Sequence, residues 1–282
     1  MKLVSYVHGN GASWGYIDGD CVVDLAHIAD TLKSAIASKL LIPAGRLVKD
    51  QARRRPLDEL RLLPPIPDPT RILCVGQNYV AHREEMQGDT TSRPLIFTRF
   101  ASSLVGHRQP LLKPSSSDQF DFEGELAIII GRRGRCIDKI QALDYIAGYS
   151  CFMDGSVRDF QNHTTQYIPG KNFDHSGAFG PWMIPAGCIP DPNAGLALQT
   201  RLNGEIVQQT TTDLMIFDVP TIIHYLSSFT TLEPGDIIAT GTPGGVGYKR
   251  EPQLFMKAGD EIEVDVEAVG TLTNTVRNEP VD

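Results

Sequence analysis

The sequence has no hydrophobic run long enough to form a membrane-spanning helix. No apolar segment approaches the roughly 20 residues that a helix needs to cross a bilayer. The first residues, MKLVSYVHGNGASWG, are interrupted by glycines and polar residues too early to contain the apolar centre of a signal peptide. We therefore expect a soluble, cytoplasmic protein that does not work at a membrane.

The sequence is also short of basic residues. It contains 26 Lys and Arg against 34 Asp and Glu, which is a formal net charge of −8 at pH 7. A protein that binds duplex DNA normally carries a basic excess on the domain that contacts the phosphates. The densest basic run, Arg53–Arg55, is equally typical of a solvent-exposed helix end. We therefore expect no nucleic-acid partner.

Several motifs of well-known enzyme classes are absent. The five cysteines are scattered and form no CxxC, which argues against a thiolate zinc site or a disulfide scaffold. No GxSxG is present, and this weakens a serine-hydrolase interpretation. The glycine-rich segment 240–247, TGTPGGVG, lacks the lysine of a P-loop. Such a segment lets backbone N–H groups and the Thr242 hydroxyl approach a ligand, although a plain tight turn is the alternative.

The length and one proline-rich segment indicate two unequal parts. With 282 residues, 41% of them hydrophobic, the chain can form one large domain or two smaller ones. Residues 63–69, LPPIPDP, cannot form a helix or a central strand, so they predict a linker. We expect a small N-terminal region over residues 1–66 and a catalytic, metal-binding domain over residues 70–282.

Strand patterns outnumber helix patterns. Apolar spacing indicates one helix over about residues 24–41, and an early proline suits a second helix over residues 219–229. Asn-Gly within residues 196–210 predicts a hairpin, and residues 261–276 predict another. The apolar run in residues 122–131 predicts a buried strand. Because strands and helices do not alternate, we expect a β-rich α+β fold rather than a doubly wound one.

Two glutamates at the start of this buried strand indicate a metal site. Glu123 and Glu125 are two residues apart, so on a strand they point to the same side. Two carboxylates beside a buried run repel each other unless a cation joins them, and Mg²⁺ or Mn²⁺ prefers such oxygen ligands. The alternative is a strand end with both acids in water. Asp154 is the expected third ligand, although for this aspartate taken alone a helix N-cap is the better explanation.

Other polar residues could supply proton transfer and charge stabilisation. His82 and Glu85 are adjacent on a helical turn, and a carboxylate beside imidazole fixes the tautomer that can take a proton from water. Arg158 and Gln161 are one helical turn apart, and with Lys171 they could hold a carboxylate or a developing oxyanion. A chance His–Glu pair and ordinary surface charge are the alternatives for these residues taken singly.

Together these segments resemble the fumarylacetoacetate hydrolase family. The resemblance extends from about Arg71 to Val276 and depends on several motifs in a fixed order. They are NYxxHxxE at 78–85, FEGELA at 122–127, DxxxRDxQ at 154–161, GKxFD at 170–174, LNG at 202–204 and PGDIIATGTPGGVG at 234–247.

The resemblance implies a rolled mixed β-sheet domain that assembles as a homodimer and holds Mg²⁺ or Mn²⁺. The chain also departs from the family pattern in two respects. Some members use a further carboxylate upstream of the histidine, and residues 71–76 offer none, so water or substrate would complete the metal shell; Arg99 stands where many relatives have lysine. The implied metal ligands are Glu123, Glu125 and Asp154; the implied catalytic residues are His82, Glu85 and Lys171; and the implied substrate-binding residues are Arg158, Gln161 and Thr242.

The activity implied by the resemblance is metal-dependent hydrolysis of a carbon–carbon bond in a 2,4-dioxo acid. The products would be pyruvate and a second acid, and the preferred substrates are acylpyruvates of aromatic catabolism, such as fumarylpyruvate or maleylpyruvate. Oxaloacetate decarboxylation, hydration and isomerisation of hydroxymuconate-type diacids use the same metal-enolate chemistry and remain open, since a fold does not fix a function. The His82–Glu85 pair favours hydrolysis, and a non-catalytic binding module would not need it.

Overall fold

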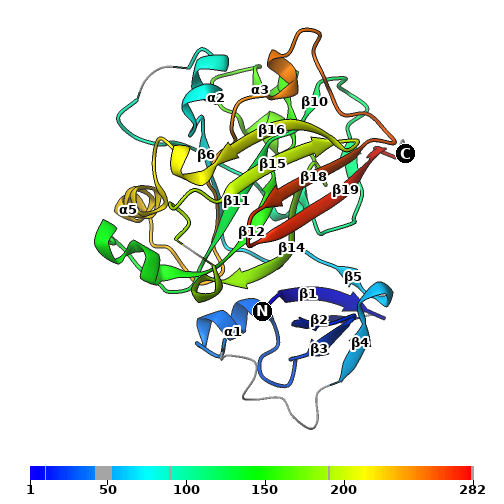
Figure 1. The fold of residues 1–282 in the computed structure, drawn as a ribbon, viewed down its shortest axis with the longest axis vertical. Helices are drawn as coiled ribbons and strands as arrows, with labels where there is room; N and C mark the ends of the chain where they lie inside the picture. The colour runs from blue at the N-terminus through cyan, green and yellow to red at the C-terminus, as the bar shows by residue number, and fades with distance from the viewer. Residues whose placement is uncertain (10, 42–52, 89–90, 190, 281–282) are drawn as a thin grey trace.

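The chain folds mainly as β-strands arranged in two facing sheets (Figure 1). The computed structural model describes residues 1–9, 11–41, 53–88, 91–189 and 191–280. Within these residues, no helix has the length and apolar character needed to cross a membrane. The five cysteines are free thiols. The expected β-rich α+β fold is confirmed.

The larger sheet runs through both parts of the chain. Its strand order is β4-β3-β2-β1-β14-β12-β11-β17-β6-β7, with β5 beside β1 and β8 beside β14. Every residue of β11 is buried, because its apolar run lies between β12 and β17 and is covered on both faces. In the main part, residues 70–280, its strands are β6 (Ile72–Gly76), β7 (Leu95–Thr98), β8 (Leu104–Val105), β11 (Gly124–Ile130), β12 (Ile146–Met153), β14 (Gly177–Pro185) and β17 (Ile237–Ala239).

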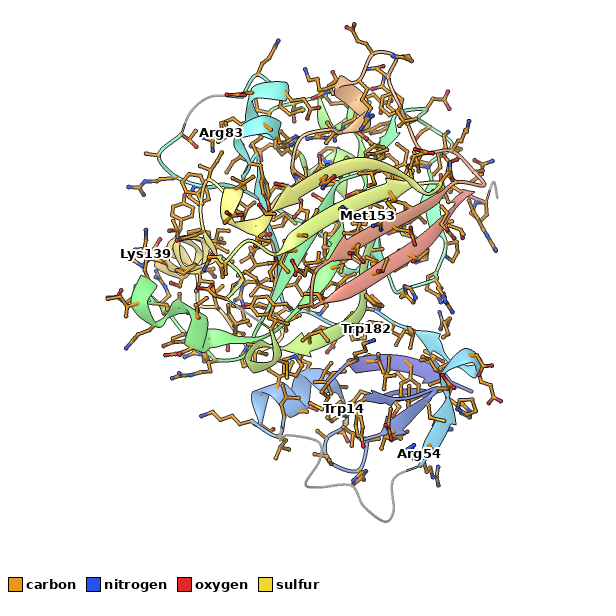
Figure 2. All side chains as sticks on the ribbon, viewed as in Figure 1. Trp14, Arg54, Arg83, Lys139, Met153 and Trp182 are labelled. Atoms are coloured by element: carbon orange, nitrogen blue, oxygen red, sulfur yellow. The ribbon has the colours of Figure 1, made fainter. Side chains whose placement is uncertain are left out.

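A five-stranded sheet packs over β11, β12 and β14. The side chains between the two sheets form the main hydrophobic core, and Met153 lies in this layer (Figure 2). Both predicted hairpins belong to this sheet and are confirmed. Its strands, in spatial order, are β16 (Glu205–Thr211), β15 (Ala197–Leu202), β18 (Glu261–Val266), β19 (Gly270–Asn278) and β9 (Leu111–Lys113).

Short helices and one small strand pair surround the sheets. The predicted helix over residues 219–229 is confirmed as α5 (Val219–Phe229), because Asp218 caps its first turn and Pro220 suits that turn. The remaining elements are α2 (Val80–Glu85), α3 (Arg158–Gln161), α4 (Ile168–Lys171), the pair β10 (Phe120–Asp121) and β13 (Ser156–Val157), and the 3₁₀ helices η1 (Leu57–Glu59), η2 (Ala101–Ser103), η3 (Lys139–Tyr145), η4 (Ala186–Cys188), η5 (Thr212–Leu214) and η6 (Gly247–Lys249).

The N-terminal part, residues 1–66, extends the larger sheet. Its first strand pairs with β14 where Leu3 faces Met183, and Lys2 lies 4.0 Å above the Trp182 ring at this junction (Figure 2). Its elements are β1 (Leu3–His8), β2 (Gly11–Asp18), β3 (Cys21–Asp24), α1 (Leu32–Ala37), β4 (Arg54–Pro56) and β5 (Arg61–Leu62).

The helix expected over residues 24–41 is wrong in its extent. Only Leu32–Ala37 is helical. Thr31 starts the helix because its side chain and that of Ser34 form a capping box, which leaves the preceding residues in turns. The helix ends before Lys39, whose φ of 56° is incompatible with a right-handed helix. The apolar spacing in the sequence therefore extends beyond the helix, because the caps set where the helix begins and ends.

Candidate active site

Three carboxylates from two neighbouring strands meet in the interior of the main part. Glu123 directly precedes β11, Glu125 lies on β11, and Asp154 follows β12. The strand ends lie side by side because Gly124 pairs with Met153, and the Asp154 amide donates to the Glu123 carbonyl at 2.8 Å. One oxygen of each carboxylate lies within 4.8 Å of the others, and all three residues are buried. The expected convergence of these acids is therefore present.

Gly124, between the two glutamates, allows the second sheet to approach. A Cβ atom at this position would lie 2.1 Å from Thr200 Oγ1, on β15, and 3.3 Å from Val264 Cγ1, on β18. Only a residue without a side chain fits such a contact. The Glu-Gly-Glu sequence thus directs two carboxylates to one side of the strand and packs closely on the other.

Two cations neutralise part of this acidic cluster. Lys171 Nζ lies 2.7 Å from Glu123 Oε2 and 2.7 Å from Asp154 Oδ2. Arg158 Nη2 lies 2.7 Å from Glu123 Oε1. Burial alone would raise the pKa of Glu123, but the nearby charges, that of Lys171 first, lower it to about 2. Glu123 is therefore held as a carboxylate.

Of the three converging carboxylates, Glu125 is the one without a cationic partner among the described residues. It accepts one hydrogen bond, from the Gly241 amide at 2.8 Å. Burial, and then the charges of Asp154 and Glu123, raise the pKa of Glu125 well above its usual value. A cation bound beside Glu125 would reverse this effect, because positive charge favours the ionised form.

The charge balance of the buried cluster fits a divalent cation. Four carboxylates face three cations, so the cluster lacks positive charge. Carboxylate oxygens are the ligands that Mg²⁺ and Mn²⁺ prefer. The acids are Asp121, Glu123, Glu125 and Asp154, and the cations are Arg99, Arg158 and Lys171. Glu123, Glu125 and Asp154 could together hold the ion.

The expected His–Glu pair is present on α2. His82 Nδ1 lies 3.3 Å from Glu85 Oε2. Glu85 also accepts hydrogen bonds from the Gly245 amide, at 3.1 and 3.2 Å, so the glycine-rich segment holds the carboxylate in place. His82 is 4% exposed and lines the same cavity as Glu123. With Nδ1 directed to a carboxylate, Nε2 is the nitrogen available to accept a proton.

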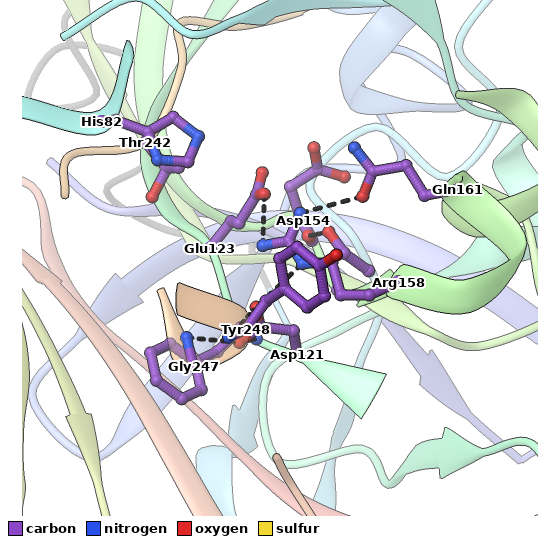
Figure 3. A network of polar contacts seen from close by, with 12 residues as sticks. His82, Asp121, Glu123, Asp154, Arg158, Gln161, Thr242, Gly247 and Tyr248 are labelled. Atoms are coloured by element: carbon purple, nitrogen blue, oxygen red, sulfur yellow. Dashed lines mark hydrogen bonds and ion pairs between the residues drawn. The ribbon is translucent and has the colours of Figure 1, made fainter. Parts of the chain in front are cut away.

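Through Asp121, Arg158 connects the acids to the 3₁₀ helix η6, far away in the sequence (Figure 3). Its Nη1 donates to Gln161 Oε1 at 2.8 Å, as expected for residues one helical turn apart. Its Nε donates to Asp121 Oδ2 at 2.8 Å. Asp121 in turn accepts from the amides of Gly247 and Tyr248, at 2.8 and 3.0 Å. The guanidinium therefore has a fixed position with one edge toward Glu123.

Thr242 lies at the site, but most hydrogen-bonding positions of its hydroxyl are already used by protein groups. It donates to the Gly124 carbonyl at 3.0 Å and accepts from Gln208 Nε2 at 2.8 Å. A hydroxyl has one donor and two acceptor positions, so only one acceptor position is left for a ligand. The contacts of Thr242 tie the glycine-rich segment to the strand that carries the glutamates.

One small cavity unites most of the expected site residues. Asp154 and Glu85 are not among the lining residues; each contacts one that is, Asp154 contacting Lys171 and Glu85 contacting His82. The expected residues that line the cavity are His82, Glu123, Glu125, Arg158, Gln161, Lys171 and Thr242, and the wall is completed by Val75, Gly76, Gln77, Met86, Phe97 and Tyr167.

Two buried residues of the cluster, Asp121 and Arg99, were not among the predicted site residues. Asp121 continues the alternation of acids in DFEGE, and this pattern could have identified it. The explanation of Asp154 as a helix N-cap is wrong, because Val157 occupies the N-cap position of α3. Asp154 is instead fully buried between two cations, Arg99 and Lys171.

Comparison with known proteins shows which family and which solved structures the chain is similar to. The family model for the C-terminal region of fumarylacetoacetate hydrolase matches residues 71–277. The mitochondrial oxaloacetate tautomerase FAHD2A of Bos taurus is 36% identical over 98% of this chain and 91% of its own length. A fumarylacetoacetate hydrolase from Exiguobacterium antarcticum has a TM-score of 0.87 at 36% identity, over 99% of this chain and all of its own.

A second similar protein has a solved structure that contains a metal ion. The maleylpyruvate hydrolase from Sphingobium sp. SYK-6 was solved with manganese(II) and pyruvate. It has a TM-score of 0.83 at 28% identity, over 99% of this chain and all of its own.

Proposed function

Since the chain belongs to the fumarylacetoacetate hydrolase family, a family of enzymes, we propose that it is a divalent-metal-dependent enzyme that interconverts the keto and enol forms of a small 2-oxo dicarboxylate, with oxaloacetate as the preferred substrate. The observation that carries the proposal is the His82–Glu85 pair on the wall of the cavity that holds the glutamates. The similarity to an oxaloacetate tautomerase over nearly the whole chain supports the choice of substrate.

The metal would be held by Glu123, Glu125 and Asp154, with Mg²⁺ and Mn²⁺ both suitable. When bound there, a divalent cation supplies positive charge beside the carboxylate and 2-oxo group of the substrate and so stabilises the enolate relative to the ketone. The excess of negative charge in the cluster and the raised pKa of Glu125 are the features that fit this ion.

His82 is the proposed acid–base residue. Its Nε2 would take a proton from the carbon beside the keto group and deliver it to the enolate oxygen to give the enol, and the reverse transfer would restore the ketone. Glu85 would fix the imidazole tautomer and stabilise the imidazolium form. Tautomerisation moves one proton and consumes no water, so this single acid–base pair is sufficient.

Arg158, Gln161 and Lys171 are the proposed substrate-binding residues, and Lys171 can also neutralise charge on the developing enolate. Arg158 and Lys171 bring two positive charges to the cavity wall, where a dicarboxylate needs them. Both cations are anchored by buried acids, so little reorganisation is needed when the substrate enters.

Hydrolysis of a 2,4-dioxo acid is the second candidate. The same base could activate a water molecule, and Lys171 and Arg158 could stabilise an oxyanion. The maleylpyruvate hydrolase with bound pyruvate favours this alternative. Identity does not separate the two candidates, because a fumarylacetoacetate hydrolase and an oxaloacetate tautomerase are each 36% identical to the chain. Hydrolysis ranks second because it needs a positioned water molecule in addition to the acid–base pair.

A substrate panel separates the two candidates. The purified, Mn²⁺-loaded protein is offered the enol form of oxaloacetate, acetylpyruvate, fumarylpyruvate and maleylpyruvate, and pyruvate and CO₂ are measured. We expect accelerated loss of the oxaloacetate enol without pyruvate, abolished by EDTA and by His82→Ala. Stoichiometric pyruvate from an acylpyruvate would favour the hydrolase. CO₂ with pyruvate from oxaloacetate would identify a decarboxylase.

A further inference from the structure

Arg99 is a buried cation of the site to which no role has yet been assigned. It directly follows β7, is 3% exposed, and uses every edge of its guanidinium. Nη1 donates to Asp154 Oδ1 at 2.5 Å and to the Gly155 carbonyl at 2.9 Å. Nε donates to Ser103 Oγ at 3.1 Å, and Nη2 donates to Ser176 Oγ at 2.8 Å.

The surroundings of Arg99 are shaped for a planar guanidinium. A Cβ atom at Gly177 would lie 2.7 Å from Arg99 Nη2 and 2.9 Å from its Cζ. The parallel pairing of β8 with β14, where Gly177 faces Leu104, brings the two serines together. A lysine ammonium is a point charge and cannot reach four acceptors spread around a plane. The site is thus specific for arginine.

A second contact fixes the backbone on both sides of Arg99. Asn172 Nδ2 donates to the Thr98 carbonyl at 3.1 Å, and its Oδ1 accepts from the Phe100 amide at 2.6 Å. Asn172 directly follows Lys171, so one side chain sets the relative position of two cations. The two cations contact different oxygens of the Asp154 carboxylate: Arg99 donates to Oδ1 and Lys171 donates to Oδ2.

We propose that Arg99 is a positioning residue for the metal, which holds the Asp154 carboxylate in the orientation in which it can act as a ligand beside Glu123 and Glu125. Without this contact, Asp154 rotates toward Lys171 as its only remaining charged partner. The inference depends on the metal-site part of the proposed function and not on the choice of substrate.

Direct measurement of Mn²⁺ binding tests the proposal. Full-length wild type, Arg99→Lys, Arg99→Gln and Gly177→Ala are freed of metal, and the Mn²⁺ dissociation constant is measured by electron paramagnetic resonance. Arg99→Lys keeps the positive charge but loses the planar set of guanidinium donors. Gly177→Ala keeps the arginine and displaces its guanidinium. Arg71→Lys is the matched control, because Arg71 Nη1 pairs with the buried Asp236 Oδ2 at 3.0 Å in a contact that does not involve the acidic cluster.

Removing a residue that orients a metal ligand typically weakens metal binding about 10–100-fold. We expect this loss in all three site variants, while Arg71→Lys loses thermal stability but binds Mn²⁺ like the wild type. If folded Arg99→Lys and Gly177→Ala bind Mn²⁺ within about twofold of the wild type, far less than such positioning effects, Arg99 has only a structural role and the proposal is overturned. A wild type that binds no Mn²⁺ would reject the metal site itself.

Discussion

Among the described residues, Glu125 is the expected metal ligand that has no cationic side chain paired with it. Burial and the neighbouring charges of Asp154 and Glu123 raise the pKa of Glu125, so the metal-free fold retains a proton that the unfolded chain releases. The free energy of unfolding therefore falls as the pH rises above the ordinary glutamate pKa. Glu125→Gln keeps the shape and can still accept from the Gly241 amide. We expect the metal-free variant to be at least as stable as the wild type at neutral pH.

The same variant should lose its response to metal. A ligand that binds only the folded state at about 100 times its dissociation constant adds about 2.7 kcal/mol to the free energy of unfolding. Wild type should gain thermal stability with Mn²⁺, and Glu125→Gln should gain little. Scanning calorimetry with and without Mn²⁺ measures both effects. Equal stabilisation of the two proteins would exclude Glu125 as a ligand.

His107 gives the protein a pH-dependent stability that does not involve the acidic cluster. Burial first, and then the charge of Arg108, lower the pKa of His107 from 6.5 to about 4. Its Nδ1 accepts a hydrogen bond from the Thr273 amide at 3.1 Å, and a proton on Nδ1 would remove this bond. Below pH 6.5 the unfolded chain binds this proton and the folded protein does not, so the free energy of unfolding falls as the pH falls toward about 4.

Replacing this histidine should flatten the pH profile. Between neutral pH and pH 5, protonation in the unfolded state lowers the free energy of unfolding by about 1–2 kcal/mol. His107→Gln cannot titrate, so urea unfolding of this variant should show a smaller decrease over the same range. An unchanged pH dependence would mean that other groups cause the loss of stability in acid.

At the scale of elements, the contact between the two sheets at Gly124 controls both stability and the site. Gly124→Ala places a methyl group 2.1 Å from Thr200 Oγ1. Overpacking of this kind costs about 1–3 kcal/mol and should displace the glutamates on either side. Gly187→Ala is the control, because its Cβ would meet nothing within 4 Å.

A double mutant shows whether steric contact is the cause. Thr200→Ala removes the atom that Gly124→Ala would strike, so the two changes together should recover part of the stability and of the Mn²⁺ affinity. Chemical denaturation of the single and double variants gives the coupling. If the effects simply add, the close approach of the sheets does not explain the glycine.

Elements with local signals could be predicted from the sequence. The helix α5 has its own cap at Asp218, and Asn203-Gly204 forms the turn of a hairpin. The N-terminal helix was predicted too long because apolar spacing carries no information about where Lys39 leaves the helical conformation. In such a segment the caps and the tertiary contacts decide the boundaries.

At the scale of the whole molecule, the site is assembled from segments that the sequence keeps apart. The residue types and the motif order indicated the acids and the His–Glu pair. The contacts of Arg99 with Asp154 and of Arg158 with Asp121 cross 55 and 37 positions. They depend on the pairing of β11 with β12 and of β10 with β13, which no local pattern specifies.

The most direct test of the proposed chemistry follows the enol form of oxaloacetate by its absorbance in stopped flow. Mn²⁺-loaded wild type is compared with His82→Asn and Glu85→Gln, and bound Mn²⁺ is measured in each sample. We predict rapid enol loss with wild type and none above background with His82→Asn. With Glu85→Gln the rate should fall about 10–100-fold at unchanged metal content. A His82→Asn protein that binds Mn²⁺ and converts the enol as fast as the wild type would contradict the proposed role of His82.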